Sequence, residues 1–97
     1  MFEFDLSDEL KLILSKLVKK DPKKVGIINK KIHEIVNRDK DTIQHYKNLQ
    51  HDLSEYKRVH IDKSFVLTFK VDLSKNFVLF ADFDHHDNIY KKSIKLR

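Results

Sequence analysis

Apolar and polar residues alternate at the start of the chain, where Phe2, Phe4 and Leu6 are separated by Glu3 and Asp5. In a β-strand, side chains two residues apart share a face, so this alternation predicts a short strand with one buried side. The period changes after Leu6, which indicates that a different element follows. We therefore expect the chain to begin with a half-buried strand.

The residues after this strand repeat with the period of a helix. Leu10, Ile13, Leu14 and Leu17 recur at i, i+3, i+4 and i+7, which aligns them in one apolar stripe. Ser7 directly precedes the stretch and can accept a hydrogen bond from a backbone N–H of the first turn, as a helix N-cap does. The pattern predicts a helix that begins after Ser7.

A second helix is predicted after Asp21 and Pro22. Asp21 can cap it, and Pro22 suits the first helical position because no intrahelical partner awaits its missing N–H there. The apolar stripe of this helix consists of Val25, Ile28, Ile32, Ile35 and Val36. The short link predicts an antiparallel helical hairpin. Gly26, the single glycine of the chain, is expected to allow close contact with the neighbouring helix.

The second half of the chain predicts strands. Three strand-like runs, joined by short polar links as hairpins require, are Tyr56–Ile61, Lys63–Val71 and Phe77–Phe83. We expect the odd-numbered residues of the second run to share one face, and likewise the odd-numbered residues of the third. The looser stretch 38–55 indicates a connection with a short strand or turn around residues 46–49.

This order of elements predicts an α+β fold. An N-terminal strand, a two-helix antiparallel hairpin and a three-stranded antiparallel meander would form one sheet with the helices packed on one face. We expect one domain over residues 1–97, because a chain of 97 residues with 40% hydrophobic content supports one modest core. The basic tail, residues 91–97, is expected to be disordered or bound to a partner.

Composition narrows the class of protein. Twenty Lys and Arg against 15 Asp and Glu give a net charge of +5, which favours an anionic partner. The absence of cysteine excludes disulfides, thiolate catalysis and zinc fingers. The N-terminus lacks the pattern of a signal peptide, and no apolar run approaches the ~20 residues that span a bilayer. We expect a cytoplasmic protein with no membrane partner.

Ionisable side chains gather on the sheet face that the helices leave uncovered. In the first run Tyr56, Arg58 and His60 share one side, whereas Val59 and Ile61 share the other. Polar residues expected to join this face from the later strands are Ser64, Thr68, Lys70, Asp82, Asp84 and His86. The face therefore combines cations, carboxylates and two histidines.

These groups match the requirements of metal-free RNA cleavage. That reaction needs a base for the ribose 2′-OH proton, a cation for the phosphate and an acid for the leaving 5′-oxygen. Histidine suits both proton roles because its ordinary pKa is about 6.5. An arginine can hold phosphate bidentately, and an aromatic ring can stack on a base. The candidate catalytic residues are His60, His86, the neighbouring His85, Arg58 and Tyr90.

Two other interpretations stay open for these side chains. A wet sheet face carries Tyr, Arg and His without any chemical role, and His33 and His45 are expected to be such surface histidines. A metal site is the other, because His85, His86 and Asp87 are acceptable zinc or manganese ligands. Adjacent residues of an extended strand point to opposite faces, however, and H-x-H and H-E-x-x-H spacings are absent. We therefore predict no metal site and no cofactor.

Three stretches carry a resemblance to a known family: Tyr56–Ile61 (YKRVHI), Ser64–Lys70 (SFVLTFK) and Phe83–Tyr90 (FDHHDNIY). They resemble the toxins of the RelE/ParE superfamily and are most similar to its YafQ-like and archaeal RelE-like branch. The resemblance implies a type II toxin that enters the ribosomal A site and cleaves mRNA, leaving a 2′,3′-cyclic phosphate and a 5′-OH. It implies two partners, a cognate antitoxin and mRNA on a 70S-type ribosome.

The resemblance also assigns residues. The histidines that serve proton transfer in YafQ-like toxins fall on His60 and His86, and the aromatic residue four positions later falls on Tyr90. Arg58 matches the basic residue two positions before the first histidine, which would bind phosphate. The other residues expected to bind RNA or phosphate are Lys47, His51, Lys63 and Lys70.

One departure from the family affects the prediction. Many members carry an arginine or an acid at the start of the central strand, where this chain has Ser64. The positive charge would then come from Arg58, Lys63 or Lys47. This leaves open a weakened enzyme, a ParE-like gyrase inhibitor without RNA chemistry, or a diverged module that binds only antitoxin. The two histidines argue against the gyrase inhibitor, which has no need of them.

Overall fold

The structure, a computed structural model, describes residues 1–50 and 54–89. Its elements are β1 (Glu3–Leu6), α1 (Asp8–Lys20), α2 (Pro22–Val36), α3 (Lys40–Ile43), β2 (Lys57–Ile61), β3 (Phe65–Asp72), β4 (Phe77–His85) and α4 (His86–Ile89). The predicted α+β order is confirmed; the single turns α3 and α4 were not expected. The expected disorder of the tail concerns residues outside those described. No helix in the described ranges is long and apolar enough to cross a membrane.

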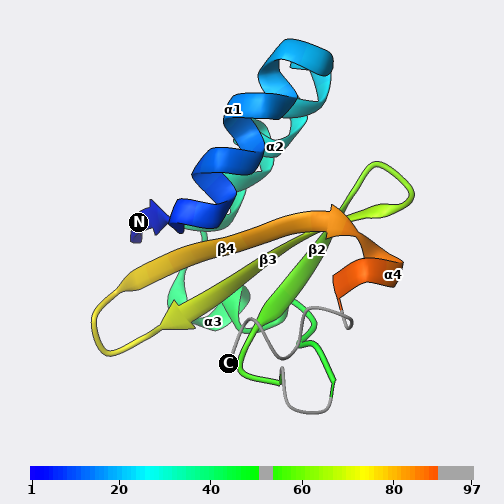
Figure 1. The fold of residues 1–97 in the computed structure, drawn as a ribbon. Coiled ribbons are helices and arrows are strands. Elements are labelled where there is room, and N and C mark those ends of the chain that lie inside the picture. The colour runs from blue at the N-terminus through cyan, green and yellow to red at the C-terminus, as the bar shows by residue number, and fades with distance from the viewer. Residues whose placement is uncertain (51–53, 90–97) are drawn as a thin grey trace.

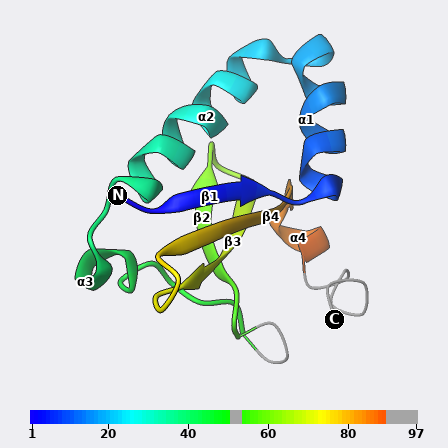
Figure 2. The same cartoon turned by 90° about the vertical axis from the view of Figure 1, so that its left-hand side faces the viewer.

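A four-stranded sheet forms the centre of the fold, in the order β1-β4-β3-β2. The pairs β2–β3 and β3–β4 are antiparallel, which confirms the predicted meander, and β1 lies parallel to β4 at the edge. The long hairpin of α1 and α2 rises over one side of the sheet (Figures 1 and 2). The helices therefore leave the opposite sheet face available for a site.

Both long helices begin where the sequence predicts. Ser7 Oγ accepts from the backbone N–H of Leu10 at 3.1 Å and donates to the carbonyl of Ala81 at 2.6 Å, so the cap also fastens α1 to β4. The carboxylate of Asp21 accepts from the N–H of Lys24 at 3.1 Å, and Pro22 occupies the first position of α2. Asp21 and Pro22 thus form the tight turn between the two helices.

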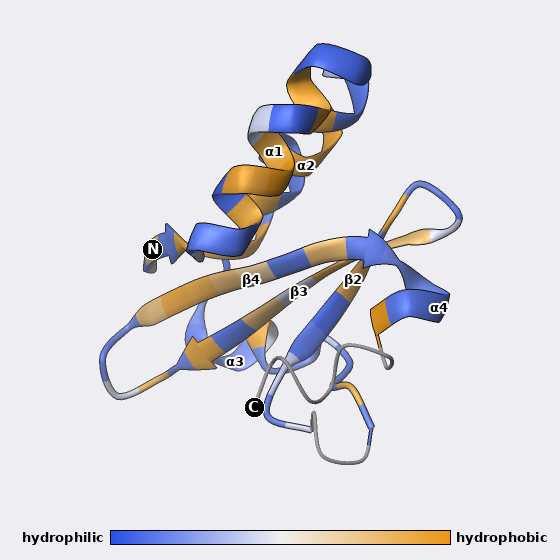
Figure 3. Ribbon diagram, in the orientation of Figure 1, coloured by the Kyte–Doolittle hydropathy of each residue, from blue (hydrophilic) through white to orange (hydrophobic). Residues whose placement is uncertain are grey.

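The main core lies between the helical hairpin and the sheet. Ile28 and Ile35 of α2 and Leu10 of α1 are fully buried, and the apolar residues of both helices form stripes among polar ones (Figure 3). From the sheet, the ring of Phe69 contacts that of Phe80 at 5.7 Å between centroids. Burial of these large side chains stabilises the fold through the area they remove from water.

A β-bulge between β3 and β4 changes which side chains reach this core. Thr68 pairs with Asp82, whereas the next residue, Phe69, pairs with Phe80, so Ala81 is an extra residue in β4. An extra residue inverts the two-residue alternation on one side of it. The expectation that the odd-numbered residues of β4 share one face is therefore wrong. The β4 side chains in the main core are Val78, Phe80 and Phe83.

Gly26 does not mediate a close helix contact, contrary to the expectation from the sequence. A Cβ placed there would meet no heavy atom within 4 Å, and the residue is exposed. Glycine in a helix interior is less favourable than alanine by about 0.5–1 kcal/mol, because it loses more backbone freedom on folding.

Gly26→Ala is therefore expected to raise the free energy of unfolding by about 0.5–1 kcal/mol. Urea denaturation would measure the gain. Gly26→Ser is a graded control whose stability should lie between those of the wild type and Gly26→Ala, since serine has intermediate helix propensity. A loss of stability with alanine would mean that the glycine has a role that the surrounding contacts do not reveal.

Lys57 fastens the connection between α2 and β2. Its Nζ donates to the carbonyls of Gln44 and Tyr46 at 3.1 and 3.0 Å and to Asn48 Oδ1 at 2.9 Å. Burial lowers the pKa of this ammonium group. Asn48 also forms an isolated bridge with Lys57, which agrees with the predicted short strand or turn. The anchor places Leu49 on the sheet face away from the helices.

Candidate functional site

A pocket of about 490 Å³ lies on the sheet face opposite the helical hairpin. Its lining residues are Leu49, Arg58, His60, Lys63, Val66, His86, Asp87 and Ile89. Four of these are candidates from the sequence: the two histidines, the arginine and Lys63. The fold thus joins side chains from β2, from the β2–β3 turn and from α4.

The alternation of side chains along β2 decides which of its residues reach the site. Val59 and Ile61 pack in the main core, so Arg58 and His60 lie on the other face, as the sequence predicts. His60 pairs with Val66 of β3, whose buried side chain lines the same pocket. The β2–β3 pairing therefore sets a histidine beside an apolar wall.

The end of β4 brings in the second histidine. The strand stops at His85, and His86 begins the short helix α4. The backbone N–H of His86 donates to the carbonyl of Ser64 at 2.9 Å, which ties the start of α4 to the β2–β3 turn. Ser64, the position that departs from the family, thus helps to place His86 through its backbone.

A small apolar cluster forms the base of the pocket. Leu49, Val66 and Ile89 are each at most 3% exposed and pack together, with Tyr56 against them. Ile89 holds α4 down on the sheet, and Leu49 is held by the Lys57 anchor. An apolar base keeps water away from one side of the charged groups, which strengthens their interaction with a bound anion.

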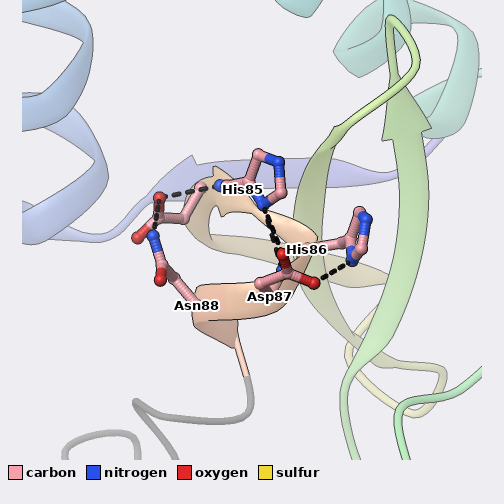
Figure 4. Close-up of polar contacts among 5 residues, drawn as sticks. His85, His86, Asp87 and Asn88 are labelled. Atoms are coloured by element: carbon pink, nitrogen blue, oxygen red, sulfur yellow. Dashed lines mark hydrogen bonds and ion pairs between the residues drawn. The ribbon is translucent and has the colours of Figure 1, made fainter.

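Asp87 lines the pocket but is not among the catalytic candidates expected from the sequence. Its Oδ1 lies 2.9 Å from Nδ1 of His86 (Figure 4). A carboxylate has no proton to share, so this contact favours the proton of the neutral His86 ring on Nδ1 and the lone pair on Nε2. A carboxylate directly beside a candidate histidine was the available signal in the sequence.

His85 lies beside the pocket rather than among its lining residues. Its ring stacks on that of His86, with centroids 4.8 Å apart and an interplanar angle of 29°. Its Nδ1 accepts from the backbone N–H of Asp87 at 3.2 Å. The expectation that the two histidines point to opposite faces is wrong, because the strand ends between them and alternation no longer applies.

Two of the expected RNA ligands lie outside the pocket. Lys47 is exposed and contributes its carbonyl, which accepts from the N–H of Arg58 at 2.8 Å. Lys70 pairs with Glu55 at 3.3 Å and lies over the ring of Tyr56. The remaining two candidates, His51 and Tyr90, lie outside the described residues.

Two polar residues expected on this open face are not accessible. Thr68 and Asp82 are fully buried, and Thr68 Oγ1 donates to the carbonyl of Asp82 at 3.4 Å. They pair with each other across β3 and β4, in the same row as Arg58. They contribute to the sheet beneath the site rather than to a surface that a ligand contacts.

Comparison with known proteins finds relatives over nearly the whole chain. No protein-family model matches it. It is 54% identical over 92 residues to the Methanocaldococcus jannaschii protein named Putative toxin RelE4, covering 95% of this chain and 94% of the relative. It is 41% identical over 90 residues to a Methanosarcina mazei protein named only as uncharacterized, covering 93% of this chain and all (100%) of that one.

Solved structures share the fold at low sequence identity. YafQ from Escherichia coli matches with a TM-score of 0.70 at 15% identity, over 93% of this chain and 99% of its own. The YoeB/ParE toxin from Agrobacterium tumefaciens matches with a TM-score of 0.71 at 16% identity, over 88% and 99%. Identities this low establish the common architecture alone.

Proposed function

This chain belongs to the RelE family of the RelE/ParE superfamily, and on that premise we propose that it is the toxin of a type II toxin–antitoxin pair that cleaves mRNA on the ribosome. The observation that carries the proposal is the pocket, where His60 and His86 meet Arg58 and Lys63 on an apolar base. Proton-transfer groups and phosphate-binding cations thus share one cavity.

The chemistry follows from these groups. One histidine takes the proton of a ribose 2′-OH, and the freed oxygen attacks the adjacent phosphorus. The bond from phosphorus to the 5′-oxygen breaks, and the other histidine protonates that oxygen. The products are a 2′,3′-cyclic phosphate and a 5′-OH. Arg58 and Lys63 would hold the phosphate oxygens as negative charge develops on them.

The Asp87 contact favours one assignment of the two proton roles. Because the Asp87 carboxylate 2.9 Å away favours the proton on Nδ1, the neutral His86 ring presents Nε2 as a proton acceptor. His86 would then act as the base and His60 as the acid. Asp87 is a positioning residue in this scheme, since it acts through His86.

Primer extension on translated mRNA after induction of the protein tests the proposal. New 5′ ends within coding regions, absent when translation initiation is blocked, would support ribosome-dependent cleavage. Intact mRNA together with inhibition of purified gyrase in a supercoiling assay would replace it with a ParE-like mechanism. Harmless overexpression without any antitoxin would leave only an antitoxin-binding module.

A cognate antitoxin is the protein partner of this proposal. The pocket and the helical hairpin both carry excess basic charge, so we expect an acidic or amphipathic segment to cover part of this surface. Co-expression with the protein encoded by a neighbouring reading frame should restore growth and yield a stable complex.

A further inference from the structure

Three side chains at the start of α4 form a cluster with the donors of a transition-metal site. His85, His86 and Asp87 each offer one ligand atom, and these atoms lie within 4.8 Å of one another. We propose that the three residues bind a divalent ion of the zinc type, and that the bound ion withdraws His86 from RNA cleavage. The binding stands on geometry alone, whereas the effect on cleavage rests on the proposed function.

The two imidazole rings converge on one carboxylate. Nδ1 of His86 lies 2.9 Å from Oδ1 of Asp87, and Nδ1 of His85 lies 3.6 Å from Oδ2 (Figure 4). Each ring thus directs the same nitrogen toward the same acid. The turn from strand to helix creates this arrangement, because an extended chain would separate the neighbouring rings.

The lone pair of His85 Nδ1 is directed toward Asp87. Its Nδ1 accepts from the backbone N–H of Asp87, so in the neutral ring this nitrogen carries a lone pair rather than a proton. Oδ2 of Asp87 is a second acceptor, 3.6 Å from the same nitrogen. A cation bound to both atoms would take the place of the backbone N–H on the lone pair of His85 and would also neutralise the carboxylate.

Small side-chain rotations would bring the three ligand atoms to the spacing found around a coordinated ion. Ligand atoms that share a tetrahedral ion at about 2.1 Å lie roughly 3.4 Å apart. The side chains of His85, His86 and Asp87 are 38%, 52% and 65% exposed, so each has solvent-facing space for the adjustment. Water would complete the coordination.

The donor set indicates which ions would bind. Imidazole nitrogens suit zinc, copper, nickel and cobalt. Magnesium and calcium prefer oxygen ligands, and this cluster offers two nitrogens and only one carboxylate. Because the cluster has no thiolate and is open to solvent, we expect it to bind the ion more weakly than a structural zinc site does. The ion would act as a reversible ligand.

Metal binding and proton acceptance by His86 exclude each other. An ion on Nδ1 takes the position where Asp87 favours the proton, and the proton of the neutral coordinated ring is then on Nε2. The nitrogen that would take the 2′-OH proton is thereby blocked. The ion also occupies the Asp87 carboxylate that contacts the His86 ring.

Isothermal titration of the tag-free protein with ZnCl₂ tests the binding. We expect one site in the wild type, at least about tenfold weaker binding in His85→Gln and in Asp87→Asn, and no binding of MgCl₂. His33→Gln and His45→Gln remove exposed histidines elsewhere and should bind zinc like the wild type. Unchanged affinity in His85→Gln, or no binding by the wild type, would overturn the proposal.

Two readouts test the effect on His86. Zinc at saturation should slow mRNA cleavage at least about tenfold in the wild type, and the ratio of rates with and without zinc should approach one in His85→Gln. Histidine ¹H–¹⁵N spectra should show the proton of His86 on Nε2 once zinc is bound. Bound zinc without either change would refute the exclusion. Absent cleavage without zinc would refute the proposed function, while the titration and spectra still decide the metal site.

Discussion

Replacement of either His60 or His86 with glutamine is expected to lower mRNA cleavage by about 10²–10⁴-fold, the usual contribution of a general acid or base. Glutamine keeps much of the size and polarity of the ring but transfers no proton at neutral pH. Both side chains line the pocket, and His60 is exposed, so neither is needed by the core. Growth arrest on induction should be lost with cleavage.

The matched controls are His33→Gln and His45→Gln, which remove exposed histidines outside the pocket and should leave cleavage unchanged. Primer extension on translated mRNA gives the rates, and urea denaturation checks that each variant stays folded. The double variant should be about as inactive as either single one, because two groups that act in one step are not additive. If both single variants still arrest translation, the acid–base assignment is wrong.

Arg58→Gln is expected to lower cleavage by about 10²–10³-fold, because it removes a cation that would bind the phosphate as charge builds up. Arg58→Lys should lie between the wild type and Arg58→Gln. Lysine keeps the charge but loses the planar fork that holds two oxygens at once. The series therefore separates charge from bidentate geometry, with primer extension as the measurement.

Lys30→Gln is the charge-matched control for this series. Lys30 is exposed on α2, away from the residues that line the pocket, so the variant has the same change in net charge without touching the site. If it weakens cleavage as much as Arg58→Gln, general attraction to RNA would explain the arginine effect. If Arg58→Gln cleaves within about twofold of the wild type, Arg58 does not bind the reacting phosphate.

The elements of this fold could be read from local pattern because local physics determines them. The stripe from Leu10 to Leu17 and the caps Ser7 and Asp21 depend on residues within a few positions, and both helices begin where these predict. The alternation in β2 likewise separates Arg58 and His60 from Val59 and Ile61. The family resemblance then identified His60 and His86 together as the candidate proton-transfer residues.

The β-bulge at Ala81 and the turn into α4 could not be read in this way. Nothing in the run from Phe77 to Phe83 marks the residue at which the pairing with β3 shifts, because the shift depends on the partner strand. The end of β4 at His85 depends on contacts with other elements. Ile89 packs on Leu49 and Val66, and the N–H of His86 reaches the carbonyl of Ser64.

The sequence by itself determined the α+β order and where both long helices begin, and it put forward the two histidines as candidates, because periodicity, capping and motif spacing are properties of neighbouring residues. The tertiary structure alone decided which side chains meet. It placed His60, His86, Arg58 and Lys63 in one pocket and left Lys47 and Lys70 outside. It also brought the rings of His85 and His86 close to Asp87, because β4 ends at His85 and α4 begins at His86 where it packs on the sheet.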